Sequence, residues 1–175
     1  EDLLVAARAD IGKLPIDAKA VDLIEQVEQA VKAVPDLDIE INSDGGSSPI
    51  AFADPSRVRQ ILRNLLSNAQ RYGGATVSIR CGADGDRTWV EVIDDGDGIP
   101  MAEADKVFEP YQRAHNAEGQ PLSVGLGLTV SRKLAELMGG DLNYSHRAGS
   151  SVFRLELPLA GRVHAVASGE DPTKD

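Results

Sequence analysis

The segment DPSRVRQILRNLLSNAQRYGG, residues 54–74, carries the strongest helical signal in the chain. Asp54 can accept hydrogen bonds from the free amides that open a helix, and Pro55 at the first helical position loses no hydrogen bond. Apolar residues then recur every three or four positions as far as Tyr72, and Gly73-Gly74 predict a left-handed stop. We therefore expect an amphipathic helix from Asp54 to about Tyr72.

Three polar residues lie along the border of this apolar stripe. Asn64, Asn68 and Arg71 are four and three residues apart, so a helix places them on one side. Asparagine carboxamides can ligate Mg²⁺ together with phosphate and water, and an arginine can bind phosphate oxygens. The same spacing also suits an ordinary solvated helix face, and both interpretations stay open for this helix taken alone.

The rest of the chain mixes helical and strand-like periodicity. Helical spacing occurs in residues 1–11, 17–34 and 127–138. Alternation typical of strands occurs in residues 37–42, 50–53, 76–81, 88–93, 141–145 and 152–157. The glycine-containing residues 82–86 predict a hairpin loop. We predict an α+β fold: a two-layer α/β sandwich whose mixed, mostly antiparallel sheet is covered on one face by helices.

Composition limits the classes of protein. The 175 residues suit one domain with an aliphatic core, since aromatic residues make up 4%. The 18 basic against 28 acidic residues, a net charge of −10, disfavour nucleic acid and anionic membranes as partners. The single cysteine, Cys81, and the lack of a long apolar run fit a cytoplasmic setting. The missing initial Met leads us to expect a fragment or processed product.

A second motif, Asp94-Asp-Gly-Asp-Gly-Ile-Pro100, directly follows a predicted strand. It lacks the alternating acids and the final Glu of a calcium loop, and it is richer in acids than a plain turn needs. A carboxylate at a strand end can instead accept a hydrogen bond from the exocyclic amine of a purine. The glycines would let the backbone approach the ring, so this motif favours a purine site.

A third motif, Val124-Gly-Leu-Gly-Leu128, leads into a predicted helix. Its glycines would leave backbone amides free at the helix start, where phosphate binds readily. It is neither a Rossmann fingerprint, since Val130 replaces the third glycine and no strand precedes it, nor a P-loop. A flexible loop remains the alternative interpretation.

Taken in this order and spacing, the motifs resemble those of the sensor histidine kinases. The matching segments are Asn64–Tyr72 (N box), Asp94–Pro100 (G1 box), Val107–Tyr111 (F box), Gly125–Leu128 (G2 box), Gly139–Pro158 (closing strands) and Leu3–Leu14 (end of the dimerisation helix). The resemblance covers about residues 1–158. It implies a catalytic and ATP-binding domain with the Bergerat fold, in the GHKL superfamily that also includes gyrase and MutL.

The resemblance implies a binding site for Mg·ATP. Asp94 would receive the adenine amino group, Asn68 with Asn64 would hold Mg²⁺, and Arg113 would steady the γ-phosphate. Catalytic roles would fall to Asn64, Arg71 and Arg113. The residues expected to contact the nucleotide are Asn64, Asn68, Arg71, Tyr72, Asp94, Gly96, Gly98, Ile99, Tyr111, Arg113, Gly125, Leu126, Gly127, Leu128 and Ser151.

Asn64 bears on the reaction. ATP-hydrolysing relatives place a glutamate base at this position, and an amide cannot deprotonate water. The resemblance therefore implies transfer of the γ-phosphoryl group to a histidine on a separate dimerisation domain, for relay to a response regulator. Two alternatives stay open, a serine kinase like the anti-sigma factors and a degenerate nucleotide-binding regulatory domain.

The resemblance also divides the chain. Residues 1–14 would end the dimerisation helix, 15–159 would form the catalytic domain and 160–175 a flexible tail. The histidines, His115, His146 and His164, lack the context of a phosphoacceptor and are expected to be surface residues. The fragment should then be a monomer that does not phosphorylate itself, from a homodimeric protein whose membrane anchoring is left open.

Overall fold

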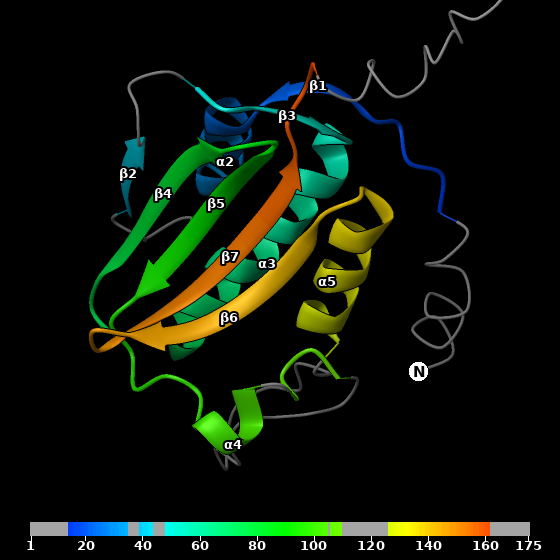
Figure 1. Cartoon of the computed structure of the whole chain (residues 1–175). Helices are drawn as coiled ribbons and strands as arrows, with labels where there is room; N and C mark the ends of the chain where they lie inside the picture. The colour runs from blue at the N-terminus through cyan, green and yellow to red at the C-terminus, as the bar shows by residue number, and fades with distance from the viewer. Residues whose placement is uncertain (1–13, 35–38, 44–47, 105, 110–125, 162–175) are drawn as a thin grey trace, which may run out of the picture.

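The computed structural model describes residues 14–34, 39–43, 48–104, 106–109 and 126–161. A five-stranded sheet forms one layer, and helices α2, α3 and α5 lie together on one of its faces (Figure 1). The predicted α+β two-layer sandwich is thus confirmed.

The sheet has the strand order β2-β4-β5-β7-β6. Its strands are β2 (Ile39–Ser43), β4 (Val77–Asp84), β5 (Arg87–Asp94), β6 (Asp141–Arg147) and β7 (Ser150–Pro158). Only the β2–β4 pair is parallel among these, and the other three pairs are antiparallel. The mixed, mostly antiparallel sheet matches the prediction.

Helix α3 (Pro55–Tyr72) supplies more buried core residues than either α2 or α5. Asp54 caps it as predicted, with Oδ1 accepting from the amide of Ser56 at 2.8 Å and that of Arg57 at 3.3 Å. Burying each large aliphatic side chain contributes about 1.5–3 kcal/mol. Its fully buried stripe is Val58, Ile61, Leu62, Leu65 and Leu66.

The end of α3 differs from the prediction. Gly73 has φ −72° and ψ 171°, an extended conformation, and Gly74 has no positive φ, so the left-handed stop was wrong. A Cβ added at Gly73 would lie 2.3 Å from the carbonyl oxygen of Ala69, and one at Gly74 would lie 2.4 Å from Oδ1 of Asp95. The two glycines are needed for close packing, and they bring the helix end onto the segment that follows β5.

The predicted helix over 17–34 is wrong in its first part. Lys19–Asp22 form strand β1, which pairs antiparallel with β3 (Ile50–Ala53), and α2 spans only Leu23–Val31. Asp22 accepts from the amide of Glu25 at 3.1 Å and so marks the helix start. Pairing with a strand that lies far along the chain overrides the local periodicity here.

Two hairpins join antiparallel neighbours in the sheet, β4 with β5 and β6 with β7. The β4–β5 strands extend to Asp84 and Arg87, so the loop is shorter than the predicted residues 82–86, and Gly85 has φ 60°. In the β6–β7 turn both Ala148 (φ 52°) and Gly149 (φ 79°) are left-handed. Two such residues suit the right-handed twist of a hairpin, but the conformation strains the alanine.

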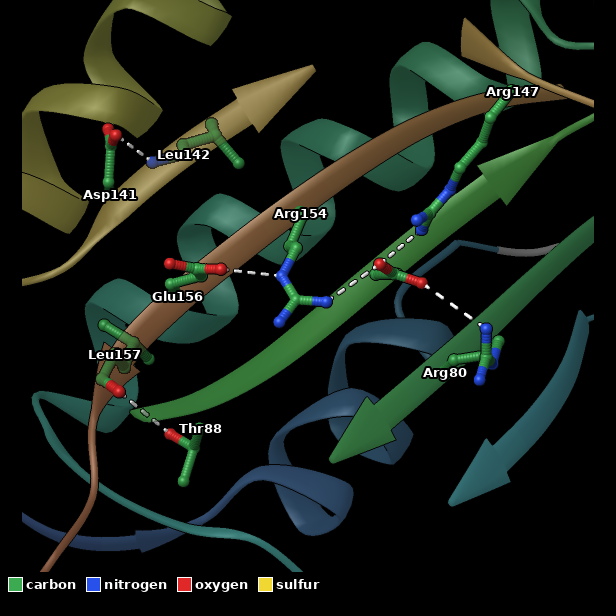
Figure 2. Close-up of polar contacts among 9 residues, drawn as sticks. Arg80, Thr88, Asp141, Leu142, Arg147, Arg154, Glu156 and Leu157 are labelled. Atoms are coloured by element: carbon green, nitrogen blue, oxygen red, sulfur yellow. Dashed lines mark hydrogen bonds and ion pairs between the residues drawn. The ribbon is translucent and has the colours of Figure 1, made fainter. Parts of the chain in front are cut away.

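The other face of the sheet, here called the outer face, carries no described helix (Figure 1). Glu91 lies on it with only 1% of its surface exposed. Arg80, Arg147 and Arg154, from three other strands, converge on one carboxylate (Figure 2). Nη1 of Arg154 lies 3.0 Å from Oε1 of Glu91, and Nη1 of Arg80 lies 3.8 Å from Oε2. These four residues are the Glu91 cluster.

Trp89 lies beside this cluster on the outer face and is 7% exposed. The guanidinium of Arg154 lies 4.5 Å from the indole centroid, and that of Arg80 lies 5.8 Å away. The indole covers Gly82, where an added Cβ would lie 2.4 Å from Cζ2. Two arginines of the outer face, Arg80 and Arg154, therefore cover the Trp89 ring.

Candidate functional site

The site is built at one end of the sheet, on the face toward the helices. Asp94, the last residue of β5, pairs with Ser151 of β7, which in turn pairs with His146 of β6. Asp94 is 6% exposed and Ser151 is 4% exposed, whereas His146 is exposed. The sheet thus aligns an acid, a hydroxyl and an imidazole across three strands.

Among the described residues, the carboxylate of Asp94 has no arginine or lysine ion-pair partner. Its Oδ1 accepts from the amide of Gly96 at 3.1 Å. Burial raises the pKa of Asp94 above its ordinary value, against the Gly96 amide and the Ser151 hydroxyl, which lower it; Asp95 raises it further and His146 lowers it. The carboxylate accepts from two described donors, the Gly96 amide and the Ser151 hydroxyl, and so retains acceptor sites for a ligand donor.

The neighbouring acid, Asp95, binds a backbone amide next to β4. Its Oδ1 accepts from the amide of Thr76 at 2.8 Å, and this hydrogen bond is the largest of the causes that hold the pKa of Asp95 below its ordinary value. The sequence grouped Asp94 and Asp95 in one acidic motif. The structure separates a ligand-facing candidate from a residue that fastens the loop to the start of β4.

The end of α3 lies directly against this motif. A Cβ added at Gly96 would lie 2.8 Å from the carbonyl oxygen of Tyr72 and 3.0 Å from Oδ1 of Asp94. Tyr72 itself is 58% exposed, so its side chain is accessible to a ligand. The structure therefore brings together the end of the first motif and the start of the second.

The far end of the same loop rests on β6. The amide of Ile99 donates to the hydroxyl of Tyr144 at 2.8 Å. Gly98 has φ 75°, and a Cβ there would lie 2.5 Å from Nδ1 of His146. Sequence reasoning did not single out Tyr144 and treated His146 only as a surface residue, because nothing local links β6 to this loop.

Asn64 connects α3 to α5 (Gly127–Leu137). Its Nδ2 donates to Oγ of Ser131 at 3.0 Å, and a Cβ added at Gly127 would lie 2.3 Å from its Oδ1. Leu126, 6% exposed, precedes the helix and gives it no side-chain cap. Within the described residues the opening amides of α5 therefore have no side-chain acceptor, and they lie close to Asn64.

Asn68 and Arg71 follow Asn64 on the same side of α3. Asn68 is half-buried, and its carboxamide makes no hydrogen bond to another described residue; Arg71 is exposed. Within the described part of the chain, no group of three or more His, Cys, Asp or Glu could hold a metal. This donor set fits Mg²⁺ bound mainly through phosphate and water, with amide oxygens completing the shell.

The start of the predicted F box packs on α5. Val107 is 7% exposed, and the guanidinium of Arg132 lies 4.9 Å from the ring centroid of Phe108. Arg132 is itself held by Asp141 at 3.1 Å. The predicted site residues Tyr111, Arg113 and Gly125 lie outside the described residues, as do residues 1–13 and 162–175.

The fold is an α/β sandwich domain, and the candidate site lies between the end of its sheet and two helices. A sequence profile described as "Histidine kinase-, DNA gyrase B-, and HSP90-like ATPase" matches residues 53–161. The chain belongs to this family, and the predicted resemblance is confirmed.

Relatives narrow the class. The chain is 43% identical over 126 residues to the aerobic respiration control sensor protein ArcB of Escherichia coli, covering 69% of this chain and 15% of that protein. It is 32% identical over 169 residues to the probable sensor histidine kinase TcrY of Mycobacterium tuberculosis, covering 92% and 35%. The chain thus spans about a third or less of each of these relatives. It corresponds to the ATP-binding catalytic domain of sensor histidine kinases.

Solved structures agree on the fold. The catalytic domain of histidine kinase ThkA superposes with a TM-score of 0.71 at 24% identity, over 82% of this chain and 96% of that one. Full-length ShkA, solved in complex with AMPPNP, gives a TM-score of 0.76 at 25% identity, over 89% of this chain and 34% of that one. No helix in the described residues is long and apolar enough to cross a membrane.

Proposed function

We propose that this chain binds Mg·ATP and delivers the γ-phosphoryl group to a histidine of a separate dimerisation domain. The observation that carries the proposal is the buried carboxylate of Asp94 at the end of a sheet that matches histidine kinase catalytic domains. Burial raises the pKa of this carboxylate, and no arginine or lysine of the described residues pairs with it. A carboxylate in this position can accept a hydrogen bond from the adenine amino group.

The base-binding part of the site uses the loop after β5. Asp94 accepts from the exocyclic amine, Ser151 supports that carboxylate, and Gly96, Gly98 and Ile99 shape the pocket around the ring. Support comes from the close packing of Gly96 against Tyr72 and from the hydrogen bond of Gly96 to Asp94. Shape and one charged acceptor together favour adenine over guanine, because guanine presents a carbonyl where adenine presents its amine.

The phosphate-binding part uses the two helices. Asn68 with Asn64 would hold Mg²⁺, which neutralises charge on the triphosphate when bound. Arg71 and Tyr72 face phosphates and ribose, and the amides of Gly125–Leu128 meet phosphate at the start of α5. Tyr111 and Arg113 complete the proposed set, with Arg113 at the γ-phosphate.

The reaction moves one phosphoryl group. The bond between the γ-phosphorus and the β,γ-bridging oxygen breaks, a nitrogen–phosphorus bond forms on the acceptor imidazole, and ADP leaves. Asn64 cannot act as a base toward water, because it is a neutral amide, so hydrolysis is not assisted at that position. Catalysis by Arg71, Arg113 and the helix-start amides then consists of positioning and charge stabilisation.

The proposed partners follow from this reaction. They are the dimerisation and phosphoacceptor domain of the same protein and the receiver domain of a response regulator, in the cytoplasm. Nucleic acid and membrane are not proposed as partners, in line with the net charge of −10.

Two experiments test the proposal. Calorimetric titration should show binding of Mg·ADP and Mg·ATP and little binding of Mg·GTP. Incubation with γ-labelled ATP and the cognate dimerisation domain should give acid-labile label on that domain. Acid-stable label would indicate a serine kinase, and binding without transfer to the cognate acceptor would indicate a regulatory nucleotide-binding domain; either result overturns the proposal.

A further inference from the structure

The loop from Asp95 to Pro100, here called the base loop, crosses the end of the sheet and is attached at both ends. At its start, Oδ1 of Asp95 accepts from the amide of Thr76, so this end is fastened beside β4. At its other end, the amide of Ile99 donates to the hydroxyl of Tyr144 on β6. In the strand order these two anchors lie on opposite sides of β5 and β7.

The anchor at β6 is itself rigidly held. Tyr144 is half-buried, and its ring packs on Phe153 with centroids 5.0 Å apart and an interplanar angle of 49°. This contact fixes where the hydroxyl lies. Gly98, next to Ile99, is in close contact with His146, two residues along β6 from Tyr144. The end of β6 therefore forms a wall against which the last part of the base loop rests.

We propose that Tyr144 is a positioning residue for adenine binding, acting through the main chain of Ile99. This inference rests on the proposed function, because it assigns Ile99 and Asp94 to the base. Asp94 belongs to the sheet and cannot shift easily, whereas Ile99 is placed by its loop. The Tyr144 hydroxyl sets the distance between the two, and so the width of the slot that receives the ring.

Tyr144→Phe tests this directly, since it removes one hydroxyl and keeps the ring on Phe153. The amide of Ile99 then loses its acceptor whether or not nucleotide is bound, so the base loop is no longer held in place and must be ordered on binding. An ordering cost of about 1 kcal/mol corresponds to roughly fivefold weaker binding. We expect this loss, about five- to tenfold, for both Mg·ADP and Mg·ATP. The ratio of the two affinities should not change, because Mg·ATP differs from Mg·ADP only by the γ-phosphate. The proposed contacts of that phosphate do not involve the base loop.

Two control variants match the change. Ser145→Ala alters the adjacent residue of β6, whose side chain points to the outer face by strand alternation. Thr88→Val removes a different buried hydroxyl, which donates to the carbonyl of Leu157 at 3.3 Å at the other end of the sheet (Figure 2). Both should bind nucleotide like the wild type, although Thr88→Val loses a comparable hydrogen bond.

A second measurement follows the anchor without any nucleotide. Amide hydrogen exchange by NMR should be faster at Ile99 in Tyr144→Phe and unchanged at Gly96, which is bonded to Asp94. Wild-type affinity in Tyr144→Phe, or a loss confined to Mg·ATP, would overturn the assignment of Tyr144 while leaving the proposed function intact. Failure of the wild type to bind adenine nucleotides would overturn the proposed function, and the role of Tyr144 with it.

Discussion

Asp94 and Glu91 are two buried acids on one strand, and their surroundings differ in charge. Glu91 faces the outer side of the sheet and is shared by three arginines. Asp94 faces the helices and is bonded to a backbone amide and a hydroxyl, and its pKa is raised by burial. A buried acid surrounded by cations has its charge balanced within the fold, whereas one without them is left to bind a ligand donor.

The largest expected effect comes from Asp94→Asn. Removing the charge from a buried acceptor should weaken Mg·ADP binding by roughly 10- to 150-fold, since a hydrogen bond to a charged group contributes about 1.5–3 kcal/mol. The free energy of unfolding should not fall, because the wild-type carboxylate is penalised by its burial. Calorimetry and urea unfolding measure the two quantities, and unchanged affinity would place the base elsewhere.

Glu91→Gln should show the reverse pattern. Neutralising the acid leaves three arginines facing each other, and we expect the free energy of unfolding to fall by roughly 1–3 kcal/mol. The arginines are 30–55% exposed, so water moderates the loss. Nucleotide affinity should stay within twofold of the wild type. A variant that unfolds normally but binds poorly would mean that the two acids are not independent.

The pH dependence of binding sharpens the contrast. Burial raises the pKa of Asp94 above the ordinary value of 3.8. As the pH falls, the wild type should therefore lose affinity for Mg·ADP at a higher pH than it would with an ordinary aspartate. Protonation replaces a charged acceptor by a neutral acid. Because the folded pKa is raised, the stability contribution of Asp94 is present below the unfolded pKa and is lost as pH rises through the folded one.

The contribution of Asp94 is isolated by difference. Asp22, Asp54 and Asp95 have lowered pKa values and act in the opposite direction on stability, so the total curve mixes both signs. For both the free energy of unfolding and the affinity for Mg·ADP, subtracting the pH profile of Asp94→Asn from that of the wild type removes the effect of these three groups. A difference in affinity that does not change with pH would contradict the role of the Asp94 charge.

The smallest expected effect is at the β6–β7 turn, which leads into the strand that carries Ser151 on one face and Arg154 on the other. Ala148→Asn places a residue that tolerates φ near 52° before Gly149. The Asn-Gly pair suits this turn, and the free energy of unfolding should rise by about 0.5–1 kcal/mol. Thermal unfolding measures it, and nucleotide affinity serves as the control. A lower melting temperature would show that the alanine is not strained.

Local patterns predicted the parts of the fold that are specified locally. Helix α3 has a cap, a 3.6-residue period and a long apolar stripe, so its bounds and buried face followed from sequence. Strand β1 was missed because Lys19–Asp22 are extended only by pairing with β3, some thirty residues further along. The stop at Gly73 was misjudged because that glycine serves close packing against Asp94, a contact that no local rule describes.

The candidate site divides in the same way. The motif around Asp94 could be found because its acids and glycines are adjacent in sequence. Its division into a proposed base acceptor, Asp94, and an anchoring Asp95 needed the position of Thr76. The proposed role of Tyr144 needed a contact across 45 residues. The arginines around Glu91 come from three strands whose order is not written in any one segment.

Because Trp89 packs over Gly82 on the outer face, its intrinsic fluorescence can report on that face without an added label. Trp89 is the only tryptophan, so all intrinsic indole emission comes from the outer face. Five residues of extended strand, about 17 Å, separate it from Asp94. Its fluorescence should therefore follow the opening of the Glu91 cluster during unfolding and stay nearly silent when a ligand fills the other side of the sheet.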